Sequence, residues 1–374
     1  MLKDRIKELD ILRAIAFILV VNQHIVGGYS FIKDLPYSEF MILKILYVIA
    51  KPAVPIFLTV SSIALVHVYY KKLDVSKYYI KRLKYIFIPY VIWSAINMYK
   101  LGNEDRFNNF ISQVLCGNAG FHLWYMGMII RLFLYFPIIL WISKKIYNSN
   151  KIIRAMIFTS IFPIYYMINK YQNVISDNVG KFIFTNPSEL QQKFINVSIL
   201  FWILYFILGI YISLNFTFFK KTITKFKWVV ILVYMCLLSY SFLNEIGQVK
   251  FVRSIYILFN IFTILFFYVI SVYLSKKHIC YNTFNFISKY SFAAYMGHII
   301  IINKVVSFVM TTFNTTDKLF VGVLTWIITS FITPLFISII NCIPYFHYVT
   351  GTKHNILKDI LKYRNSLIKV DKSL

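Results

Sequence analysis

Acidic and sulfur-containing side chains are scarce in this chain. Only 14 of its 374 residues are Asp or Glu, and its four cysteines, Cys116, Cys236, Cys280 and Cys342, lack metal-ligand spacing. The GxSxG, Walker, HExxH and CxxC patterns are absent, so serine-hydrolase, P-loop and zinc chemistries have no support. A cleavable signal peptide is not expected, because residues 1–10 are charged and no small-residue cleavage site follows the first apolar run.

Long apolar stretches are abundant. The chain is 59% hydrophobic, has a mean hydropathy of +0.66 and is 14% charged, whereas a soluble domain is about 25% charged. Apolar runs of about 18 to 25 residues recur along its length, which is enough to cross a bilayer as a helix. The sequence predicts an all-α, polytopic membrane protein with about ten transmembrane helices. The expected spans are residues 11–30, 41–68, 85–101, 122–143, 153–169, 196–215, 227–244, 254–274, 286–309 and 319–345.

The basic residues indicate an orientation. If the N-terminus lies inside, the six inside segments hold 26 of the 40 Lys and Arg residues and the outside loops hold nine. Cytoplasmic loops carry such an excess, so both termini are expected in the cytoplasm. Topology and contact with anionic membrane lipid then account for the net charge of +26, and nucleic acid is not an expected partner. We expect one transmembrane domain, residues 1–348, and a basic cytoplasmic tail, residues 349–374.

Two ionisable residues, Arg13 and His24, lie within the first apolar stretch. Ionisable groups inside a hydrocarbon span are costly, so each is a candidate functional residue. Eleven helical residues turn through about 1,100°, roughly 20° past whole turns, so the two side chains share a face about 16 Å apart. Asn22 and Gln23 beside the imidazole favour a polar cavity over lipid. The structural alternatives are a snorkelling cation for Arg13 and a packing histidine for His24.

A basic cluster, Lys81, Arg82 and Lys84, lies where the third span enters the membrane from the cytoplasmic side. Guanidinium and ammonium groups there suit a phosphate-rich ligand, although a cytoplasmic flank of any membrane helix would look the same. Pro89 follows and is expected to kink the helix.

The second span contains Pro52 and Pro55, which predict irregular backbone facing protein or water. Lys51 lies beside them as a deep cation with no acidic residue nearby in sequence. Its structural alternative is a buried lysine bonded to carbonyl groups.

The fourth and ninth spans carry further polar and aromatic candidates. His122 and Trp124 open the fourth span, where His122 is expected to line a mouth above His24, and Trp124 also fits an aromatic belt. In the ninth span, Tyr295 and His298 are three residues apart and therefore share a face. Small residues surround them and permit close helix packing: Ser291, Ala293, Ala294 and Gly297.

These motifs together resemble the integral-membrane acyltransferase 3 family, and within it the short members that act on surface polysaccharides. The matching segments come in the family's order and cover nearly the whole chain. They are Leu9–Ala16 leading to His24, Phe57–Ser62, Lys81–Pro89, Leu123–Tyr125, Phe206–Gly209 and Tyr290–His298.

The resemblance implies an O-acyltransferase in the bacterial cytoplasmic membrane. Its expected reaction moves an acyl group, most often acetyl, from cytoplasmic acyl-CoA to a hydroxyl of a cell-surface or lipid-linked glycan. Acetyl-CoA would be a co-substrate, no cofactor would be permanently bound, and membrane lipid and polysaccharide synthase components are compatible partners.

The same resemblance assigns roles to the candidate residues. His24 would be the general base for the attacking hydroxyl, or alternatively an acyl-accepting nucleophile, since a neutral imidazole suits either role near pH 7. Arg13 would contact the donor or fix its entrance. The remaining candidates divide into donor-binding residues, Lys81, Arg82 and Lys84, and acceptor-side residues, His122, Trp124, Tyr295 and His298.

Two other functions fit the same sequence. One is an exporter or flippase for a glycan or lipid-linked sugar, in which Arg13, Lys51 and Arg131 bind substrate anions. The other is a non-catalytic assembly partner of a glycan synthase. The acylation of the surface glycan in cells that carry His24→Ala separates the enzyme from both.

Overall fold

The computed structural model describes residues 5–32 and 34–354, and within them it contains helices and no strand. Three short segments are not α-helical: the π-helix η1 (Leu83–Phe87) and the 3-10 helices η2 (Glu104–Asn109) and η3 (Ile199–Phe201). The α-helices are α1 (Lys7–Tyr29), α2 (Tyr37–Ala50), α3 (Ala53–Tyr69), α4 (Val75–Arg82), α5 (Ile88–Lys100), α6 (Phe110–Leu115), α7 (Trp124–Tyr147), α8 (Lys151–Lys170), α9 (Gln172–Phe184), α10 (Glu189–Asn196), α11 (Ile203–Leu214), α12 (Phe216–Lys225), α13 (Lys227–Glu245), α14 (Arg253–Leu274), α15 (His278–Thr312), α16 (Lys318–Ile340) and α17 (His347–Thr350).

The expected all-α polytopic architecture is confirmed, with fewer long spans than expected. Eight helical stretches among the described residues are long and apolar enough to cross a membrane, and α11 with α12 makes a ninth if a pair bent by 99° counts as one span. The expected spans 85–101 and 196–215 are the two that fall short. The first is interrupted by η1 before Pro89, and the second ends where the chain turns from α11 into α12.

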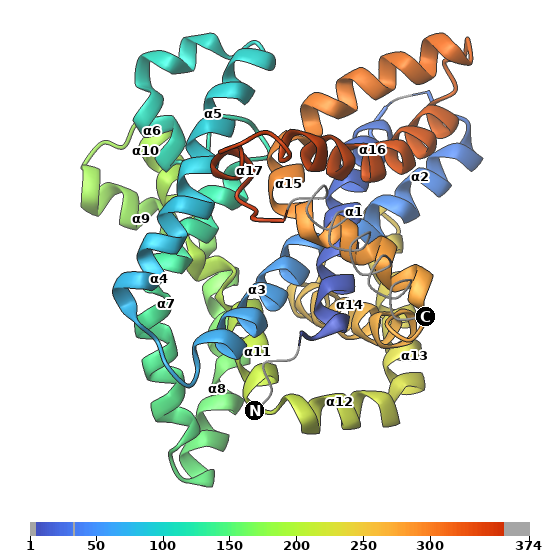
Figure 1. Ribbon diagram of the computed structural model, residues 1–374. Helices are drawn as coiled ribbons and strands as arrows, with labels where there is room; N and C mark the ends of the chain where they lie inside the picture. The colour runs from blue at the N-terminus through green and yellow to red at the C-terminus, as the bar shows by residue number, and fades with distance from the viewer. Residues whose placement is uncertain (1–4, 33, 355–374) are drawn as a thin grey trace, which may run out of the picture.

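Helix α1 lies in the interior of the bundle (Figure 1), packed by α2, α3, α14, α15 and α16. Of its most apolar 18-residue stretch, 78% is buried, against 6% for α8 at the periphery. Hydrogen bonds join it to two neighbours: the Asn22 side chain of α1 donates to the Leu46 carbonyl of α2, and the Trp326 indole of α16 donates to the Ile18 carbonyl of α1. Most of the first span is therefore surrounded by protein, while Arg13 and His24 remain partly exposed.

Small residues on α15 permit the close packing that the sequence predicted. Ala293 and Ala294 are buried, and a Cβ at Gly297 would lie 2.7 Å from two ring carbons of Trp93 on α5. The Trp93 indole N–H in turn donates to the Val349 carbonyl of α17 at 3.1 Å. This contact ties the end of the described chain to the helices around the site. The predicted tail beyond residue 354 lies outside the described residues.

The irregular backbone expected at the prolines is present. Residues 51 and 52 form a turn that separates α2 from α3 within one apolar stretch. Before Pro89 the helix widens into the π-helical turn η1, as expected where proline removes a regular helical hydrogen bond.

Candidate active site

Arg13 and His24 lie toward opposite ends of the same face of α1. The Arg13 side chain is 32% exposed, and its Nη1 lies 3.9 Å from Asp10 Oδ1. The other carboxylate oxygen of Asp10 accepts a hydrogen bond from Arg5 Nε at 2.6 Å. Arg13 therefore belongs to a cluster of two cations and one anion, which carries a net positive charge.

His24 lies eleven residues further along α1, on the wall of a cavity of about 550 Å³. The cavity is lined by the last turns of α1, including Gly28, by Ile32 after that helix, and by residues of α15, including Asn303. Its imidazole is partly exposed. Neither Asn22 nor Gln23 lines this cavity, and most of its lining residues are apolar, so His24 and Asn303 are the polar side chains that border it.

Two further histidines lie directly behind His24. The ring centroids are 5.2 Å apart for His24 and His298, 6.3 Å for His24 and His122, and 5.1 Å for His122 and His298. His122 and His298 are buried, with 1% and 0% of their surface exposed. The three histidines come from α1, α15 and the loop before α7. We call them the imidazole cluster.

The expectation that His122 lines a mouth is wrong. The loop before α7 turns inward at Gly117, which has a φ of +67°, and buries His122, while the neighbouring Phe121 is 59% exposed and lies with its ring centroid 5.3 Å from that of His24. Phe121 is thus a residue near His24 that the sequence did not single out. Only the folded loop reveals it, because nothing in the local sequence distinguishes its inward from its outward face.

Hydrogen bonds to the main chain fix the orientation of both buried imidazoles. His122 Nε2 lies 3.2 Å from the Met296 carbonyl oxygen, and His298 Nδ1 lies 2.6 Å from the Tyr295 carbonyl oxygen. The Tyr295 hydroxyl donates to the His122 carbonyl. His122 precedes the apolar span Trp124–Tyr147. Burial lowers its pKa to about 4, although the bond to Met296 opposes this shift. The His122 ring is therefore neutral at pH 7.

An aromatic layer separates the imidazole cluster from Arg13. The ring of Tyr295 packs against Tyr125 of α7 at 5.5 Å and Phe57 of α3 at 6.4 Å, and Tyr125 packs against Phe57 at 5.9 Å. The same Tyr295 ring contacts His122 and His298 at 6.1 and 5.7 Å. Four helices, α1, α3, α7 and α15, thus contribute to one continuous site.

Trp124 lies beside this layer. Its ring packs against Trp202, which precedes α11, at 5.4 Å, and against Tyr125 at 6.4 Å. The structure thus connects Trp124 to the site through Tyr125.

The three basic residues of the expected donor site are separated by the fold. Lys81 and Lys84 are exposed, whereas Arg82 is partly buried with its guanidinium 5.0 Å from the ring centroids of both Tyr78 and Phe133. Arg82 lines a largely apolar cavity of about 780 Å³ between α4, η1, α5 and α7. Within the described residues, no contact of these three side chains reaches the imidazole cluster.

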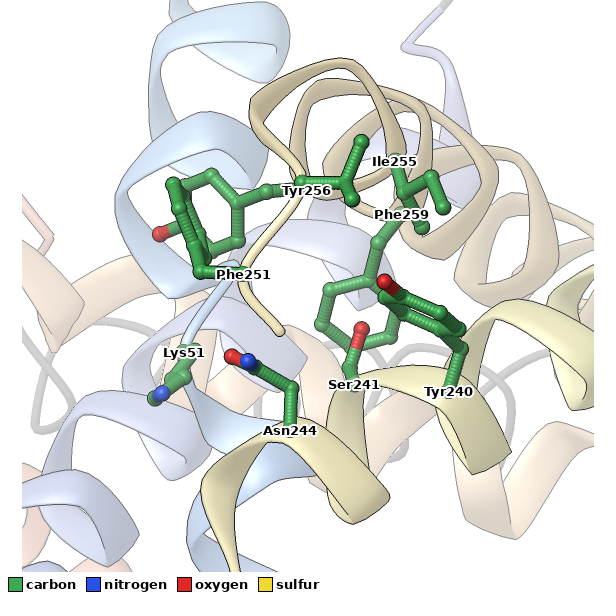
Figure 2. Close-up of a pocket in the computed structure, with 9 residues that line it drawn as sticks. Lys51, Tyr240, Ser241, Asn244, Phe251, Ile255, Tyr256 and Phe259 are labelled. Atoms are coloured by element: carbon green, nitrogen blue, oxygen red, sulfur yellow. The ribbon is translucent and has the colours of Figure 1, made fainter. Parts of the chain in front are cut away.

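Lys51 lies away from the imidazole cluster and has an acidic partner. Its ammonium pairs with Glu245 Oε2 at the end of α13, and the buried Lys44 lies 3.4 Å from the other oxygen of that carboxylate. A cavity of about 80 Å³ adjoins Lys51 (Figure 2), with Tyr240, Ser241 and Asn244 of α13 on one side and residues of α14 on the other. The sequence showed no partner because Glu245 follows Lys51 by 194 residues.

Arg131 is likewise occupied by the protein itself. Its guanidinium donates to the carbonyl oxygens of Phe194, Val197 and Leu115, at 2.6, 3.3 and 2.9 Å. These bonds hold the segments around α6 and α10 against α7. Lys51 and Arg131 therefore have structural partners, which weakens their assignment as anion-binding groups of an exporter.

Comparison with known proteins identifies the family of the chain. A family model described as an acyltransferase domain matches residues 6–346. Relatives include the probable poly-beta-1,6-N-acetyl-D-glucosamine export protein of Staphylococcus aureus strain Mu50, 26% identical over 68% of this chain and 70% of that protein. The protein of the same name from strain MSSA476 is 25% identical over the same shares. No solved structure matches the chain.

The match covers α1 to α16, including every residue of the imidazole cluster and the aromatic layer. The described helices supply the eight or nine apolar spans that an integral-membrane enzyme needs. The chain therefore belongs to the acyltransferase 3 family and is a multi-pass membrane acyltransferase.

Proposed function

We propose that this protein transfers an acetyl group from cytoplasmic acetyl-CoA to a hydroxyl of a cell-surface glycan. The observation that carries the proposal is the position of His24, which lies on the wall of the 550 Å³ cavity with the imidazole cluster behind it and Arg13 about 16 Å below on the same helix face. A cavity with one accessible imidazole suits a hydroxyl acceptor, and a cationic cluster at the other end of the helix suits a phosphate-bearing donor.

His24 acts as the general base in this reaction. The acceptor oxygen attacks the thioester carbon, its proton passes to His24, the carbon–sulfur bond breaks, and the departing sulfur takes the proton to leave as a thiol. The acceptor enters through the cavity that His24 lines, and the buried side chains of His122, Tyr295 and His298 support His24 from behind. The relatives' names make poly-β-1,6-N-acetylglucosamine a suitable first acceptor.

The donor approaches from the Arg13 side. Lys81, Lys84 and Arg82 are cations near the start of one continuous helical run, α4 to α5, and Arg82 turns toward an apolar-lined cavity. We propose that the exposed lysines attract the CoA phosphates and that Arg13 meets the donor closer to the aromatic layer. This orientation places both termini in the cytoplasm and the protein in the bacterial cytoplasmic membrane, as the distribution of basic residues predicts.

The test is acetyl transfer by purified protein in proteoliposomes. The probes are radiolabelled acetyl-CoA and a β-1,6-linked N-acetylglucosamine oligosaccharide, and the measurement is alkali-labile label on the oligosaccharide. His24→Ala should lower the rate by about 10²- to 10⁴-fold. His67→Ala is the matched control, because it removes the same kind of side chain from an exposed position on α3 that does not line the cavity. Equal rates for His24→Ala and wild type would refute the proposal.

The same preparation distinguishes the two roles of His24. Incubation with acetyl-CoA alone, followed by acid quenching and mass spectrometry of the α1 peptide, should show no acetyl group on His24 if it is a base. An acetyl-histidine in this experiment would assign it as a nucleophile.

The relatives' names support a second candidate, export of a poly-N-acetylglucosamine chain. In cells, His24→Ala should then abolish surface glycan. Our proposal expects His24→Ala cells to display the glycan without its ester-linked acetyl groups.

A further inference from the structure

His298 has one ring nitrogen that the fold leaves without a partner. Its Nδ1 lies 2.6 Å from the Tyr295 carbonyl oxygen, which only accepts, so Nδ1 carries the proton and Nε2 carries the lone pair of a neutral imidazole. Nε2 is buried and has no hydrogen-bond partner among residues 5–32 and 34–354. A buried acceptor of this kind is costly without a donor, so a donor should be sought among its neighbours.

His122 cannot be that donor. Its Nε2 faces the Met296 carbonyl oxygen at 3.2 Å, so the single proton of the neutral ring is already in use. Its other nitrogen, Nδ1, is also an acceptor without a partner and packs against Gly120, where a Cβ would lie 3.4 Å away. The rings of His122 and His298 are only 5.1 Å apart, but the unpaired nitrogen of each is an acceptor, so neither can donate to the other.

His24 is at the correct separation to supply the missing proton. Two imidazoles that share a hydrogen bond have centroids about 5.2 Å apart, because about 1.1 Å separates each centroid from its nitrogen and about 3 Å separates the nitrogens. The His24 and His298 centroids are 5.2 Å apart, whereas those of His24 and His122 are 6.3 Å apart, about 1 Å too far. Since His298 Nε2 has no partner among the described residues, the bond requires a rotation of the His24 ring beside the cavity that it lines.

We propose that His298 is the positioning residue for His24. Its Nε2 accepts the N–H of His24, which fixes the tautomer of His24 and leaves the lone pair of the other His24 nitrogen for the acceptor hydroxyl. When His24 takes the hydroxyl proton, the resulting imidazolium stays bonded to His298, and the Tyr295 carbonyl holds His298 in place from behind. The chain of groups is carbonyl, His298, His24 and hydroxyl, which follows the logic of an oriented base in a catalytic triad. This inference rests on the proposed function only in taking acetyl transfer as the reaction in which His24 is the base.

The kinetic test compares His298→Met with His298→Gln in the proteoliposome assay. Methionine fills the volume but offers His24 only a weak acceptor, whereas the glutamine side chain can place an amide oxygen near the former Nε2. His298→Met should lower kcat by roughly 10²-fold with the KM for acetyl-CoA unchanged, and His298→Gln should recover most of that loss. Ser291→Ala is the matched control on α15, because that buried hydroxyl bonds only within its own helix, and it should leave both constants unchanged.

A second measurement does not depend on the reaction. In protein labelled with ¹⁵N-histidine, solid-state NMR should show a single neutral tautomer for His24 in the wild type, a mixture in His298→Met and a single tautomer again in His298→Gln. A mixed His24 tautomer in the wild type, or equal kcat values for the Met and Gln variants, would overturn the inference. Wild-type protein that shows the single tautomer but no acetyl transfer would instead refute the proposed function alone.

Discussion

Gly297→Ala tests whether the site depends on the close approach of α15 and α5. An added Cβ would lie 2.7 Å from Trp93 Cη2 and Cζ3, whereas carbon atoms pack best at about 3.5 to 4.0 Å, so the ring has to move by about 1 Å. The Trp93 ring cannot swing freely, because it is buried and its N–H is bonded to the Val349 carbonyl. The substitution therefore strains the packing directly beside His298.

The expected cost follows from three contributions. Overpacking a buried site costs about 1–3 kcal/mol, and weakening the Trp93 hydrogen bond adds about 1 kcal/mol. Alanine recovers about 1 kcal/mol because it favours helix over glycine. We expect Gly297→Ala to lower the free energy of unfolding by about 2 kcal/mol, measured by reversible unfolding of the purified protein in mixed micelles.

A double-mutant cycle isolates the cause. Trp93→Phe removes the ring atoms that a Cβ at Gly297 would meet, so Gly297→Ala should cost about 1–2 kcal/mol less in the Trp93→Phe background than in the wild type. Gly28→Ala is the control for helix propensity, since a Cβ there has open space, and it should be neutral or slightly stabilising. Equal costs for Gly297→Ala with and without Trp93→Phe would refute the packing argument.

Three further predictions concern charge and hydrogen bonding. Glu245→Gln leaves the buried ammonium of Lys44 without its anion and should lower the free energy of unfolding by about 3–5 kcal/mol. The control Asp105→Asn changes an exposed carboxylate of η2 and should cost nothing measurable. Comparable losses for the two variants would contradict a stabilising role of the ion pair. Arg131→Lys keeps the charge but serves fewer of the three carbonyls, so we expect a loss of about 2–4 kcal/mol with acetyl-transfer kcat unchanged in the fraction that stays folded. Burial lowers the pKa of His122 from 6.5 to about 4. Between pH 6.5 and about 4 the unfolded chain therefore binds a proton at His122 that the folded protein does not. The free energy of unfolding should decrease as the pH falls through this range. At about 1.4 kcal/mol per pH unit the fall reaches about 3 kcal/mol, and the stability of His122→Gln should depend less on pH than that of the wild type.

The sequence predicted those parts of the site that lie on a single helix. Helical periodicity places Arg13 and His24 on one face of α1, and spacing puts Tyr295 and His298 together on α15. The approach of α1 to α15, which brings His24 to 5.2 Å from His298, depends on packing between distant segments and is not encoded in either helix alone.

Loops and long-range pairs were beyond sequence reasoning for a physical reason. The inward turn that buries His122 depends on Gly117, where a positive φ and close contact with Trp124 exclude a side chain, and the local sequence does not reveal which residues the turn buries. Glu245 is joined to Lys44 and Lys51 only by tertiary structure. The expected span at residues 85–101 was too long because apolar length alone does not show that Pro89 follows a π-helical turn.

The aromatic layer bears on the choice between acyl transfer and export. Phe57, Tyr125 and Tyr295 pack against one another between Arg13 and the imidazole cluster, and Tyr295 meets the other two rings edge to face. All three rings are buried. A glycan that crossed the membrane at this point would have to displace the whole layer together with its hydrogen bond from Tyr295 to the His122 carbonyl. An acyl group carried on a single extended chain is narrower than a sugar ring, so it would displace fewer of these side chains than a glycan. The layer therefore favours a path in which the donor's acyl group crosses from the Arg13 side while the glycan stays in the cavity that His24 lines.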